Sequence, residues 1–172
     1  ARRSGVSKVV GLSSDKAANP VSAYGISKAA GECAILSANN TRGSDGPIYA
    51  AVRYGNVWRS TGSVVPTWEA MIVKGLRVVP VTDPECTRYF MRRTEAVDLV
   101  MNTIDTMQGG ELNIPTLPAY RLGDLAEAMG VGIMVNGLSE FEKRHETMDG
   151  KTDSSQARRM SVDEIKKELE HV

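Results

Sequence analysis

Cysteine, histidine and long apolar runs are all scarce in this sequence, and each shortage excludes a class of protein. The 172 residues include two cysteines and two histidines. Cys33 and Cys86 lie far apart and match no metal-binding spacing, so we expect free thiols in a reducing compartment, and no metal site or disulfide framework. No apolar run approaches the roughly 20 residues of a membrane helix, and no signal peptide is visible, so we expect a cytoplasmic protein without membrane contact.

An excess of charge of either sign is also absent. The 21 basic residues balance 21 acidic ones, so no global field draws the chain to nucleic acid or to an acidic membrane. Hydrophobic residues make up 41% and charged residues 24%, as in ordinary soluble globular proteins, and 172 residues suit one domain with a real core. The first residue is Ala1 rather than Met, where a helix end is expected to run into a strand, so we expect a fragment or a processed chain.

Alternating strand and helix patterns predict an α/β protein. Strands are expected at residues 8–14, 48–54, 78–81, 88–91, 111–114 and 131–135, and helices at 22–38, 66–75, 94–107, 122–129 and from 162 onward. Pro66 is expected to open one helix and Thr94 to cap another, while Ser161 and Glu164 form a capping box. Residues 149–159 are polar and are expected to be mobile. The alternation indicates a mostly parallel sheet, with a smaller lobe in the second half.

Tyr24 and Lys28 are the first candidates for chemistry. They stand four residues apart on one predicted helix and share a face, and Glu32 follows Lys28 at the same spacing. A lysine ammonium beside a phenol favours the phenolate. Such a pair can take a proton from a sugar hydroxyl while a nicotinamide accepts the hydride from the same carbon. A surface tyrosine packed on a lysine stem has the same spacing, so the neighbouring residues must decide between the two readings.

Polar residues at the ends of two predicted strands supply that context. Residues 13–16, Ser-Ser-Asp-Lys, end the first strand, and Tyr54 ends the second, followed by Gly-Asn-Val. In open α/β sheets, ligands bind beyond the carboxyl ends of the strands. Asp15 and Lys16 by themselves would suit an exposed ion pair in a loop. Beside Tyr24 and its lysine, they favour a catalytic site at this edge of the sheet.

The segment Ser-Ser-Asp-Lys-Ala-Ala-Asn-Pro-Val-Ser-Ala-Tyr-Gly-Ile-Ser-Lys, residues 13–28, resembles the active-site segment of the UDP-N-acetylglucosamine 4,6-dehydratases. These enzymes form the polysaccharide-biosynthesis branch of the extended short-chain dehydrogenases/reductases. Further matches follow in family order at residues 52–57 (VRYGNV), 62–66 (GSVVP), 80–84 (PVTDP), 87–90 (TRYF), 109–111 (GGE) and 124–127 (DLAE). The resemblance covers nearly all of residues 1–148.

What the resemblance implies for the fold is an incomplete Rossmann-like, doubly wound parallel sheet. Residues 1–60 would form the catalytic second half of that domain, and residues 61–148 mainly a small substrate-binding lobe with returning core elements. Residues 149–172 would add a polar linker and a terminal helix. The family assembles as homo-oligomers, so self-association is expected by resemblance alone.

The resemblance also implies a mechanism. Tyr24, aided by Lys28, deprotonates the sugar 4-hydroxyl as hydride passes from C4 to the cofactor. Lys16 then removes the C5 proton, which the new 4-ketone acidifies, and a protonated Asp15 assists loss of the 6-hydroxyl as water, with Ser14 polarising the ketone. Hydride returns to C6. In the family, a tyrosine at position 24 accompanies the soluble members that invert C5, which favours inversion here.

Binding residues follow from the same resemblance. The cofactor would be NADP or NAD, and the residues expected to contact it are Ser13, Tyr24, Lys28, Tyr54, Gly55, Asn56 and Val57. The residues expected to bind the UDP-sugar substrate are Asn56, Ser63, Val64, Val65, Arg88 and Glu142. An arginine suits phosphate because of its forked, permanently charged donors. For Arg88, the alternative is a surface salt bridge.

A glycine-rich phosphate loop is missing from the chain. No Gly-x-x-Gly-x-x-Gly or Gly-x-Gly-x-x-Gly follows a strand, and Gly130-Val-Gly132 precedes one. The family keeps that element, which sets a pyrophosphate on a helix N-terminus, in an N-terminal half that these residues do not contain. We therefore expect half of a cofactor cradle and an exposed sheet edge.

A second departure lies near the C-terminus. The family pattern Gly-x-Arg-Pro-Gly-Glu-Lys-x-His-Glu corresponds to Gly-Leu-Ser-Glu-Phe-Glu-Lys-Arg-His-Glu at residues 137–146. The pattern's glutamate, lysine and histidine are matched by Glu142, Lys143 and His145. Ser139 replaces the arginine and Glu140 adds negative charge, so nucleotide binding would need Arg144 or Arg121 as a substitute. His145 is expected to be a structural or surface histidine.

Two alternatives to a dehydratase stay open. A sugar-nucleotide 4-epimerase of the same superfamily needs Tyr24 and Lys28 but has no use for Asp15 and Lys16, and only a dehydratase product loses one water. A truncated, non-catalytic sugar-nucleotide binding module is the alternative from another class, motivated by the missing cofactor half and by Ser139. Binding without turnover would indicate the module.

Overall fold

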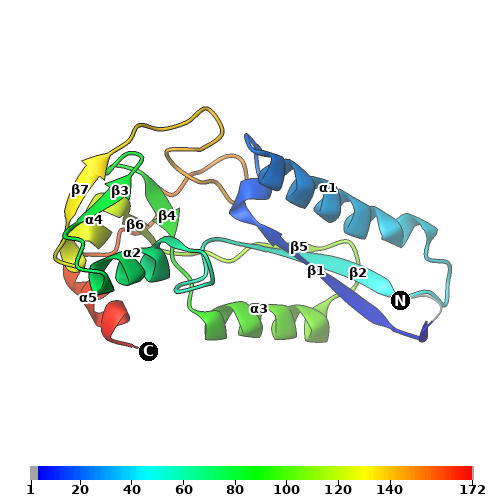
Figure 1. The fold of residues 1–172 in the computed structure, drawn as a ribbon. Helices are drawn as coiled ribbons and strands as arrows, with labels where there is room; N and C mark the ends of the chain where they lie inside the picture. The colour runs from blue at the N-terminus through cyan, green and yellow to red at the C-terminus, as the bar shows by residue number, and fades with distance from the viewer. Residues whose placement is uncertain (1–3, 172) are drawn as a thin grey trace. The chain divides into compact units, whose positions relative to one another are not determined.

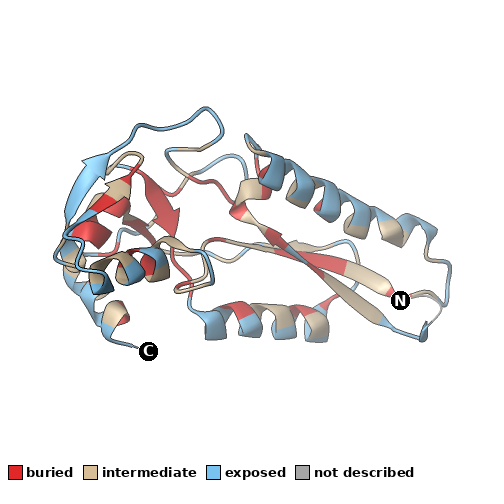
Figure 2. Cartoon of the chain, in the orientation of Figure 1, coloured by how far each residue is buried: buried red, intermediate tan, exposed pale blue. Residues whose placement is uncertain are grey.

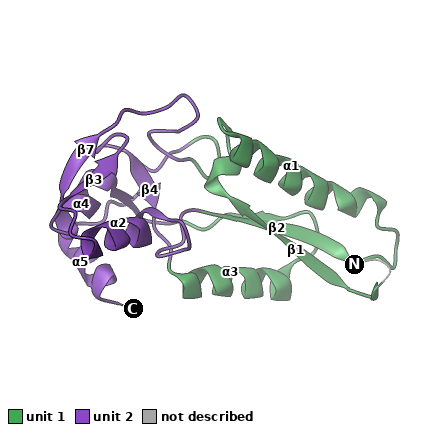
Figure 3. Ribbon diagram, in the orientation of Figure 1, with its two compact units in different colours: residues 1–54, 92–116, 147–151 green, residues 55–91, 117–146, 152–172 purple. Residues whose placement is uncertain are grey.

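A computed structural model describes residues 4–171, which alternate between strands and helices. In chain order the elements are β1 (Lys8–Ser14), the 3-10 helix η2 (Asp15–Ala17), α1 (Ala23–Ser37), the 3-10 helix η3 (Ala38–Thr41), β2 (Ile48–Tyr54), α2 (Val64–Val73), β3 (Val78–Val81), β4 (Thr87–Tyr89), α3 (Arg93–Thr106), β5 (Leu112–Asn113), β6 (Ala119–Arg121), α4 (Leu122–Ala128), β7 (Gly132–Val135) and α5 (Val162–Glu170). They form two compact units (Figure 3): unit 1 contains residues 1–54, 92–116 and 147–151, and unit 2 contains the remainder.

Unit 1 is built on a three-stranded parallel sheet in the order β1-β2-β5. Lys8–Ser14 run in register with Ile48–Tyr54, so Ser14 lies opposite Tyr54 at the carboxyl end of the sheet. Helix α1 lies along one face and α3 along the other (Figure 1). Gly11 allows α1 to approach the sheet closely, because a Cβ there would lie 2.3 Å from Ile35 Cδ1. Within the described residues β1 pairs with β2 and with no other strand.

Unit 2 combines two small sheets with three helices. Strands β3 and β7 pair in parallel, and β4 and β6 pair antiparallel. The core gathers around Trp58, whose ring centroid lies 5.1 Å from that of Phe90 and 5.6 Å from that of Tyr120. Its other buried members lie in α2, β3, α4 and α5 or directly before β4 and α5 (Figure 2): Val65, Trp68, Val79, Val81, Cys86, Leu122, Leu125, Ala126, Met160 and Ile165.

The α/β class and the parallel sheet are confirmed, and the differences lie in the starts of two helices and in three short elements that were not predicted. Helix α2 begins at Val64, so Pro66 falls inside the first turn rather than at its first position, where its missing N–H still costs no hydrogen bond. Helix α3 is capped at Arg92, because Glu95 Oε2 accepts the Arg92 backbone N–H at 2.7 Å. The prediction of Thr94 as the cap was therefore wrong. Strand β6 and both 3-10 helices were not predicted.

Part of the polar stretch 149–159 is packed rather than solvated. Ser154 is 2% exposed, its backbone N–H donates to Glu146 O at 2.8 Å, and its hydroxyl donates to Thr87 O at 3.2 Å. A polar composition predicted a mobile linker, but one buried hydroxyl ties this segment to β4.

The structure can be compared with two expectations from composition, free thiols and the lack of a membrane-spanning helix. Both cysteines are free thiols; Cys33 is exposed and Cys86 is buried, and burial raises the pKa of the Cys86 thiol. No helix in residues 4–171 has the length and apolar character that a membrane span requires.

Candidate active site

The first strand ends in a tight turn that gathers three polar side chains. Ser14 closes β1 and caps η2, because its hydroxyl oxygen accepts the Lys16 backbone N–H at 3.3 Å. The same hydroxyl donates to Asp15 Oδ1 at 2.8 Å, and Lys16 Nζ donates to that oxygen at 3.1 Å. A hydroxyl, a carboxylate and an ammonium from consecutive residues are thus held together at the carboxyl end of β1.

The carboxylate of this turn is fully buried. Asp15 has a relative exposure of 0%, whereas the Lys16 side chain is 32% exposed. Asp15 is therefore not the exposed loop ion pair that its sequence neighbours would allow. Its second oxygen, Oδ2, is buried and has no hydrogen-bond partner within residues 4–171. A buried polar atom without a partner costs about 1–3 kcal/mol, so this oxygen is a position where a ligand hydroxyl would find an unused partner.

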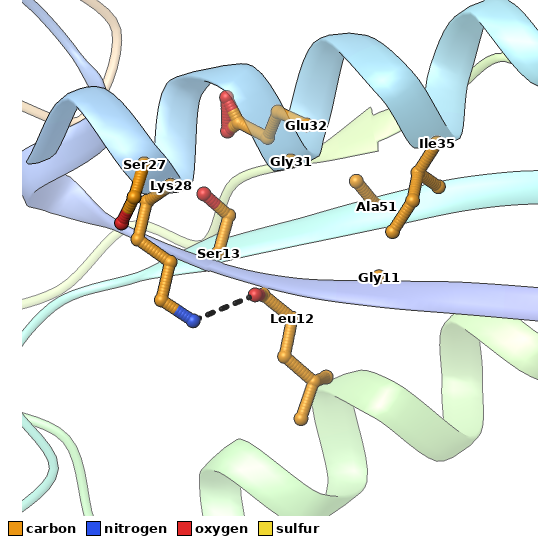
Figure 4. Close-up of a pocket in the computed structure, with 9 residues that line it drawn as sticks. All are labelled: Gly11, Leu12, Ser13, Ser27, Lys28, Gly31, Glu32, Ile35 and Ala51. Atoms are coloured by element: carbon orange, nitrogen blue, oxygen red, sulfur yellow. Dashed lines mark hydrogen bonds between the residues drawn. The ribbon is translucent and has the colours of Figure 1, made fainter. Parts of the chain in front are cut away.

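Tyr24 and Lys28 lie on α1 and share a face, as their spacing predicts. The helix is capped by Ser22, whose hydroxyl accepts the Gly25 backbone N–H at 3.1 Å. Lys28 Nζ lies 5.8 Å from the centre of the Tyr24 ring, within cation–π range, and donates to Leu12 O at 3.3 Å (Figure 4). The Tyr24 side chain stays accessible, at 54% relative exposure.

Gly25 brings the first turn of α1 against the turn that carries Asp15 and Lys16. A Cβ at Gly25 would lie 2.3 Å from Lys16 O, which only a residue without a side chain permits. Tyr54, opposite Ser14 in the sheet, is close enough to Tyr24 for the two phenols to interact: burial first, and then Tyr24, raise the pKa of Tyr54. The predicted catalytic residues of unit 1 are therefore gathered at one end of its sheet.

A cavity of about 250 Å³ lies between α1 and the sheet (Figure 4). It is lined by Gly11, Leu12, Ser13, Ser27, Lys28, Gly31, Glu32, Ile35 and Ala51. Ser13 Oγ is buried and has no hydrogen-bond partner within the described residues. Ser13 and Lys28, both predicted to contact a cofactor, thus line one cavity.

A buried ion pair behind this helix was not predicted. Arg53 Nε donates to Glu32 Oε2 at 2.8 Å, a second guanidinium nitrogen contacts Glu32 Oε1, and Arg53 NH1 donates to Met148 O at 2.6 Å. The spacing of Lys28 and Glu32 suggested contact along the helix, but Lys28 instead bonds Leu12 O. Glu32 therefore fastens α1 to β2 one turn beyond Lys28.

Unit 2 holds a second cavity, of about 230 Å³, where the substrate residues were predicted. Its lining is Asn56, Val64, Trp68, Pro80, Val81, Thr82, Arg88, Tyr120, Leu122 and Glu142. Arg88 is 8% exposed, and its NH2 donates to Glu142 Oε1 at 2.6 Å, so it is not an ordinary surface salt bridge. Thr82 Oγ1 also reaches Glu142 Oε1, at 3.3 Å. The guanidinium is thus compensated by a carboxylate within the cavity.

Other predicted binding residues of unit 2 differ in what they offer. Asn56 Oδ1 and Ser63 Oγ are buried without a partner in residues 4–171, so both can receive a ligand. Val65 is 1% exposed and belongs to the core, so its side chain packs there. Gly55 lies against Tyr89, where a Cβ would meet the Tyr89 Cβ at 2.4 Å, and Val57 forms an isolated bridge with Met91.

The altered motif at residues 137–146 brings no second cation to this cavity. Ser139 Oγ accepts the Phe141 backbone N–H at 3.3 Å. The two arginines proposed as substitutes are both engaged: Arg144 Nε lies 2.8 Å from Asp83, and Arg121 pairs with Asp124 and Glu85.

His145 has a structural partner. Its Nδ1 lies 2.8 Å from Thr87 Oγ1, beside the buried Ser154, as a structural histidine would.

Comparison with known proteins gives a consistent picture. A family model described as "Polysaccharide biosynthesis protein" matches residues 1–167. The UDP-N-acetylglucosamine 4,6-dehydratase (inverting) of Campylobacter jejuni is 38% identical over 152 residues, which are 87% of this chain and 46% of that protein.

Two solved structures extend the comparison. Pen from Bacillus thuringiensis superposes with a TM-score of 0.86 at 28% sequence identity. The superposition covers 97% of this chain and 63% of the Pen chain. The UDP-glucose 4-epimerase of Thermus thermophilus, solved with NAD, shares the fold at a TM-score of 0.67 and 21% identity, covering 99% of this chain and 67% of its own. The chain spans about half the length of the curated relatives it matches.

Proposed function

This chain belongs to the polysaccharide biosynthesis protein family, and from that premise we propose that it carries the catalytic half of a nucleotide-sugar 4,6-dehydratase acting on a UDP-N-acetylglucosamine-like substrate. The observation that carries the proposal is the buried Asp15. Asp15 Oδ1 accepts from Ser14 and Lys16, Asp15 Oδ2 has no partner among the described residues, and the first turn of α1 packs against this turn at Gly25. An acid and a base beside the tyrosine–lysine pair are what elimination of water requires and what a simple oxidation does not.

The first chemical role falls to Tyr24. Its exposed phenol takes the proton of the sugar 4-hydroxyl, and Lys28, whose ammonium lies 5.8 Å from the ring centre, places a positive charge beside it. Lys28 reaches the site from the next helical turn, so both groups approach the sugar from α1.

Elimination falls to the turn after β1. Lys16 removes the C5 proton once C4 is a ketone, and Asp15 delivers a proton to the departing 6-hydroxyl, so water leaves and a C5–C6 double bond forms. When C6 is reduced, C5 takes up a proton from solvent, which restores the saturated ring. The Ser14 hydroxyl, which donates to Asp15 Oδ1 at 2.8 Å, is proposed to turn its hydrogen to the ketone oxygen once the sugar is bound. Asp15 Oδ2 is the oxygen proposed to meet the 6-hydroxyl, because it is buried and has no hydrogen-bond partner within residues 4–171. The Campylobacter jejuni relative is a 4,6-dehydratase of the inverting type, and we propose inversion at C5 for this chain as well.

A nicotinamide dinucleotide, NADP or NAD, fits the residues present only in part. Tyr24, Lys28 and the unpaired Ser13 Oγ offer polar partners for its nicotinamide end, and Tyr54 ends the neighbouring strand. No glycine-rich phosphate loop occurs in the 172 residues. When bound, the nicotinamide supplies a hydride acceptor for C4 and a hydride donor for C6.

The nucleotide part of the substrate is proposed to bind in the cavity of unit 2. Asn56 Oδ1, an acceptor, and the Ser63 hydroxyl are buried without hydrogen-bond partners in the part of the chain that the structure describes, and Arg88 and Glu142 line the same cavity as Asn56. A UDP-sugar would use Arg88 for phosphate and Glu142 for hydroxyl groups. A cytoplasmic location and self-association remain predictions of the same proposal.

The proposal is tested by product mass and isotope incorporation in D₂O. The chain is incubated with UDP-N-acetylglucosamine and NAD or NADP, alone and with the N-terminal half of the Campylobacter relative added. Loss of one water with deuterium at C5 supports a dehydratase, and Lys16→Ala should abolish the C5 exchange. A C4 epimer without water loss would instead establish an epimerase, and nucleotide binding without turnover in either form would establish a binding module.

A further inference from the structure

Strand β7 is an edge strand with unusual exposure. Ile133, Met134 and Val135 are 39%, 56% and 58% exposed, although they form the continuous apolar run of the strand. Residues 130–138, Gly-Val-Gly-Ile-Met-Val-Asn-Gly-Leu, contain neither a charge nor a proline. Proteins protect sheet edges with lysine, proline or a covering segment, because an open edge pairs with other strands. This edge carries none of the protecting residues.

The backbone of β7 offers a defined set of hydrogen-bonding groups. Gly132 N–H donates to Arg77 O and Asn136 N–H donates to Val81 O, both at 2.9 Å, across the parallel pairing with β3. In a parallel strand, alternate residues direct both backbone groups to the same side. Ile133 and Val135 therefore direct their N–H and C=O groups away from β3, where β7 pairs with no other strand among residues 4–171.

We propose that this edge binds a second copy of the chain through antiparallel pairing of β7 with itself. The outward groups are on Ile133 and Val135, so a two-fold axis at Met134 pairs Ile133 of one copy with Val135 of the second copy, and the reverse. Each of these is a hydrogen-bonded pair, and the two Met134 residues face each other as the non-hydrogen-bonded pair between them. One register satisfies every outward backbone group of the two central positions.

A second copy suits this edge better than a charged partner. The segment brings no charge, so two copies meet without like-charge repulsion and no complementary charge selects another protein. Stable interfaces bury about 1,200–2,000 Å² in total, and one short strand gives less, so we expect a reversible dimer.

Sedimentation velocity over rising protein concentration is the first test. The wild-type chain should shift from monomer to dimer, and Met134→Lys should shift the dissociation constant upward by about tenfold or more, because two ammonium groups meet at the axis. Val73→Lys is the matched control: Val73 is 87% exposed on α2, in the same unit, and the variant should associate as the wild type does. A wild-type chain that stays monomeric over the same range overturns the proposal.

Cross-linking tests the register itself. In a Cys33→Ser background, which removes the exposed thiol, Met134→Cys should form a disulfide-linked dimer, because facing Cα atoms at about 4.5 Å lie within the window of roughly 4.4–6.8 Å for a disulfide. Val73→Cys in that background should not. Val135→Pro removes an outward N–H and leaves the bonds to β3 intact, so it should weaken association without loss of secondary structure. A dimer that persists in Met134→Lys and fails to cross-link at position 134 uses another surface and refutes the inference.

Discussion

Two glycines on helix α1 should respond to the same substitution with opposite signs. A Cβ at Gly25 would lie 2.3 Å from Lys16 O and 3.1 Å from Pro20 Cβ, whereas nothing lies within 4 Å of one at Gly31. The first obstacle is main chain, which cannot rotate away as the end of a side chain can. Gly25→Ala therefore requires α1 and the η2 turn to separate, whereas Gly31→Ala does not.

The expected magnitudes follow from this geometry. Overpacking costs about 1–3 kcal/mol, and alanine in place of a helical glycine gains roughly 0.5–1 kcal/mol. Gly25→Ala should lower the free energy of unfolding by about 1–2 kcal/mol, and Gly31→Ala should raise it by about 0.5–1 kcal/mol. Because both glycines lie on one helix, the difference between the two variants cancels general effects of helix propensity.

Urea denaturation followed by far-ultraviolet circular dichroism measures these free energies. Tryptophan fluorescence is the wrong probe, since Trp58 and Trp68 both belong to unit 2 whereas α1 belongs to unit 1. Hydrogen exchange of α1 peptides should show faster opening near Gly25 in the first variant only. Equal stability of Gly25→Ala and Gly31→Ala would refute the close packing of α1 on η2, and with it the placement of the first turn of α1 against Lys16.

Two further predictions concern ionic groups. Glu32→Gln should lower the free energy of unfolding by about 3–5 kcal/mol, because Arg53 stays buried without its carboxylate partner. Glu32→Leu combined with Arg53→Met should recover most of that loss, whereas a Glu32→Gln variant within about 1 kcal/mol of wild type would contradict the buried pair. The Ser155 hydroxyl holds the pKa of Asp153 below its ordinary value. A carboxyl with a lowered folded-state pKa stabilises the protein above its unfolded-state pKa and loses that contribution as pH falls through the folded value. Asp153→Asn should therefore flatten the decline of Tm with acidification below about pH 4, and an unchanged acid limb would show that the Ser155 contact contributes nothing.

Local patterns were sufficient to predict most of the fold. Strand β2 occupies Ile48–Tyr54 as expected, because a turn cluster precedes it and Gly55 follows it. The capping box of Ser161 and Glu164 forms with both of its hydrogen bonds. These features depend on residues only a few positions apart, so the local sequence is enough to predict them. The cap of α3 was misplaced because a glutamate reached back to an arginine, which is not a residue type that propensity favours at that position.

Features set by tertiary packing were beyond reach of the pattern. Three such features are the burial of Asp15, the pairing of Glu32 with Arg53, and the hydrogen bonds of Ser154 to β4. Each joins residues from different elements, so none can be read from the spacing of residues along the sequence. The pattern placed Asp15, Lys16, Tyr24 and Lys28 near one strand end, and their roles in catalysis remain predictions. Ser139 was recognised as a departure from the family motif, but only the structure shows that Arg144 and Arg121 are occupied elsewhere.

The chain passes between its two units after Tyr54, after Met91, after Thr116, after Glu146 and after Lys151. Neither unit is therefore a contiguous stretch that could be expressed alone. Residues 147–151 belong to unit 1 and bring the Met148 carbonyl to Arg53, so a stop codon placed after Glu146 would remove a contact from strand β2, which is encoded far upstream. Truncation series, the usual way to map function onto lobes, would damage both lobes of this protein at once, and only point substitutions can assign activity to one of them.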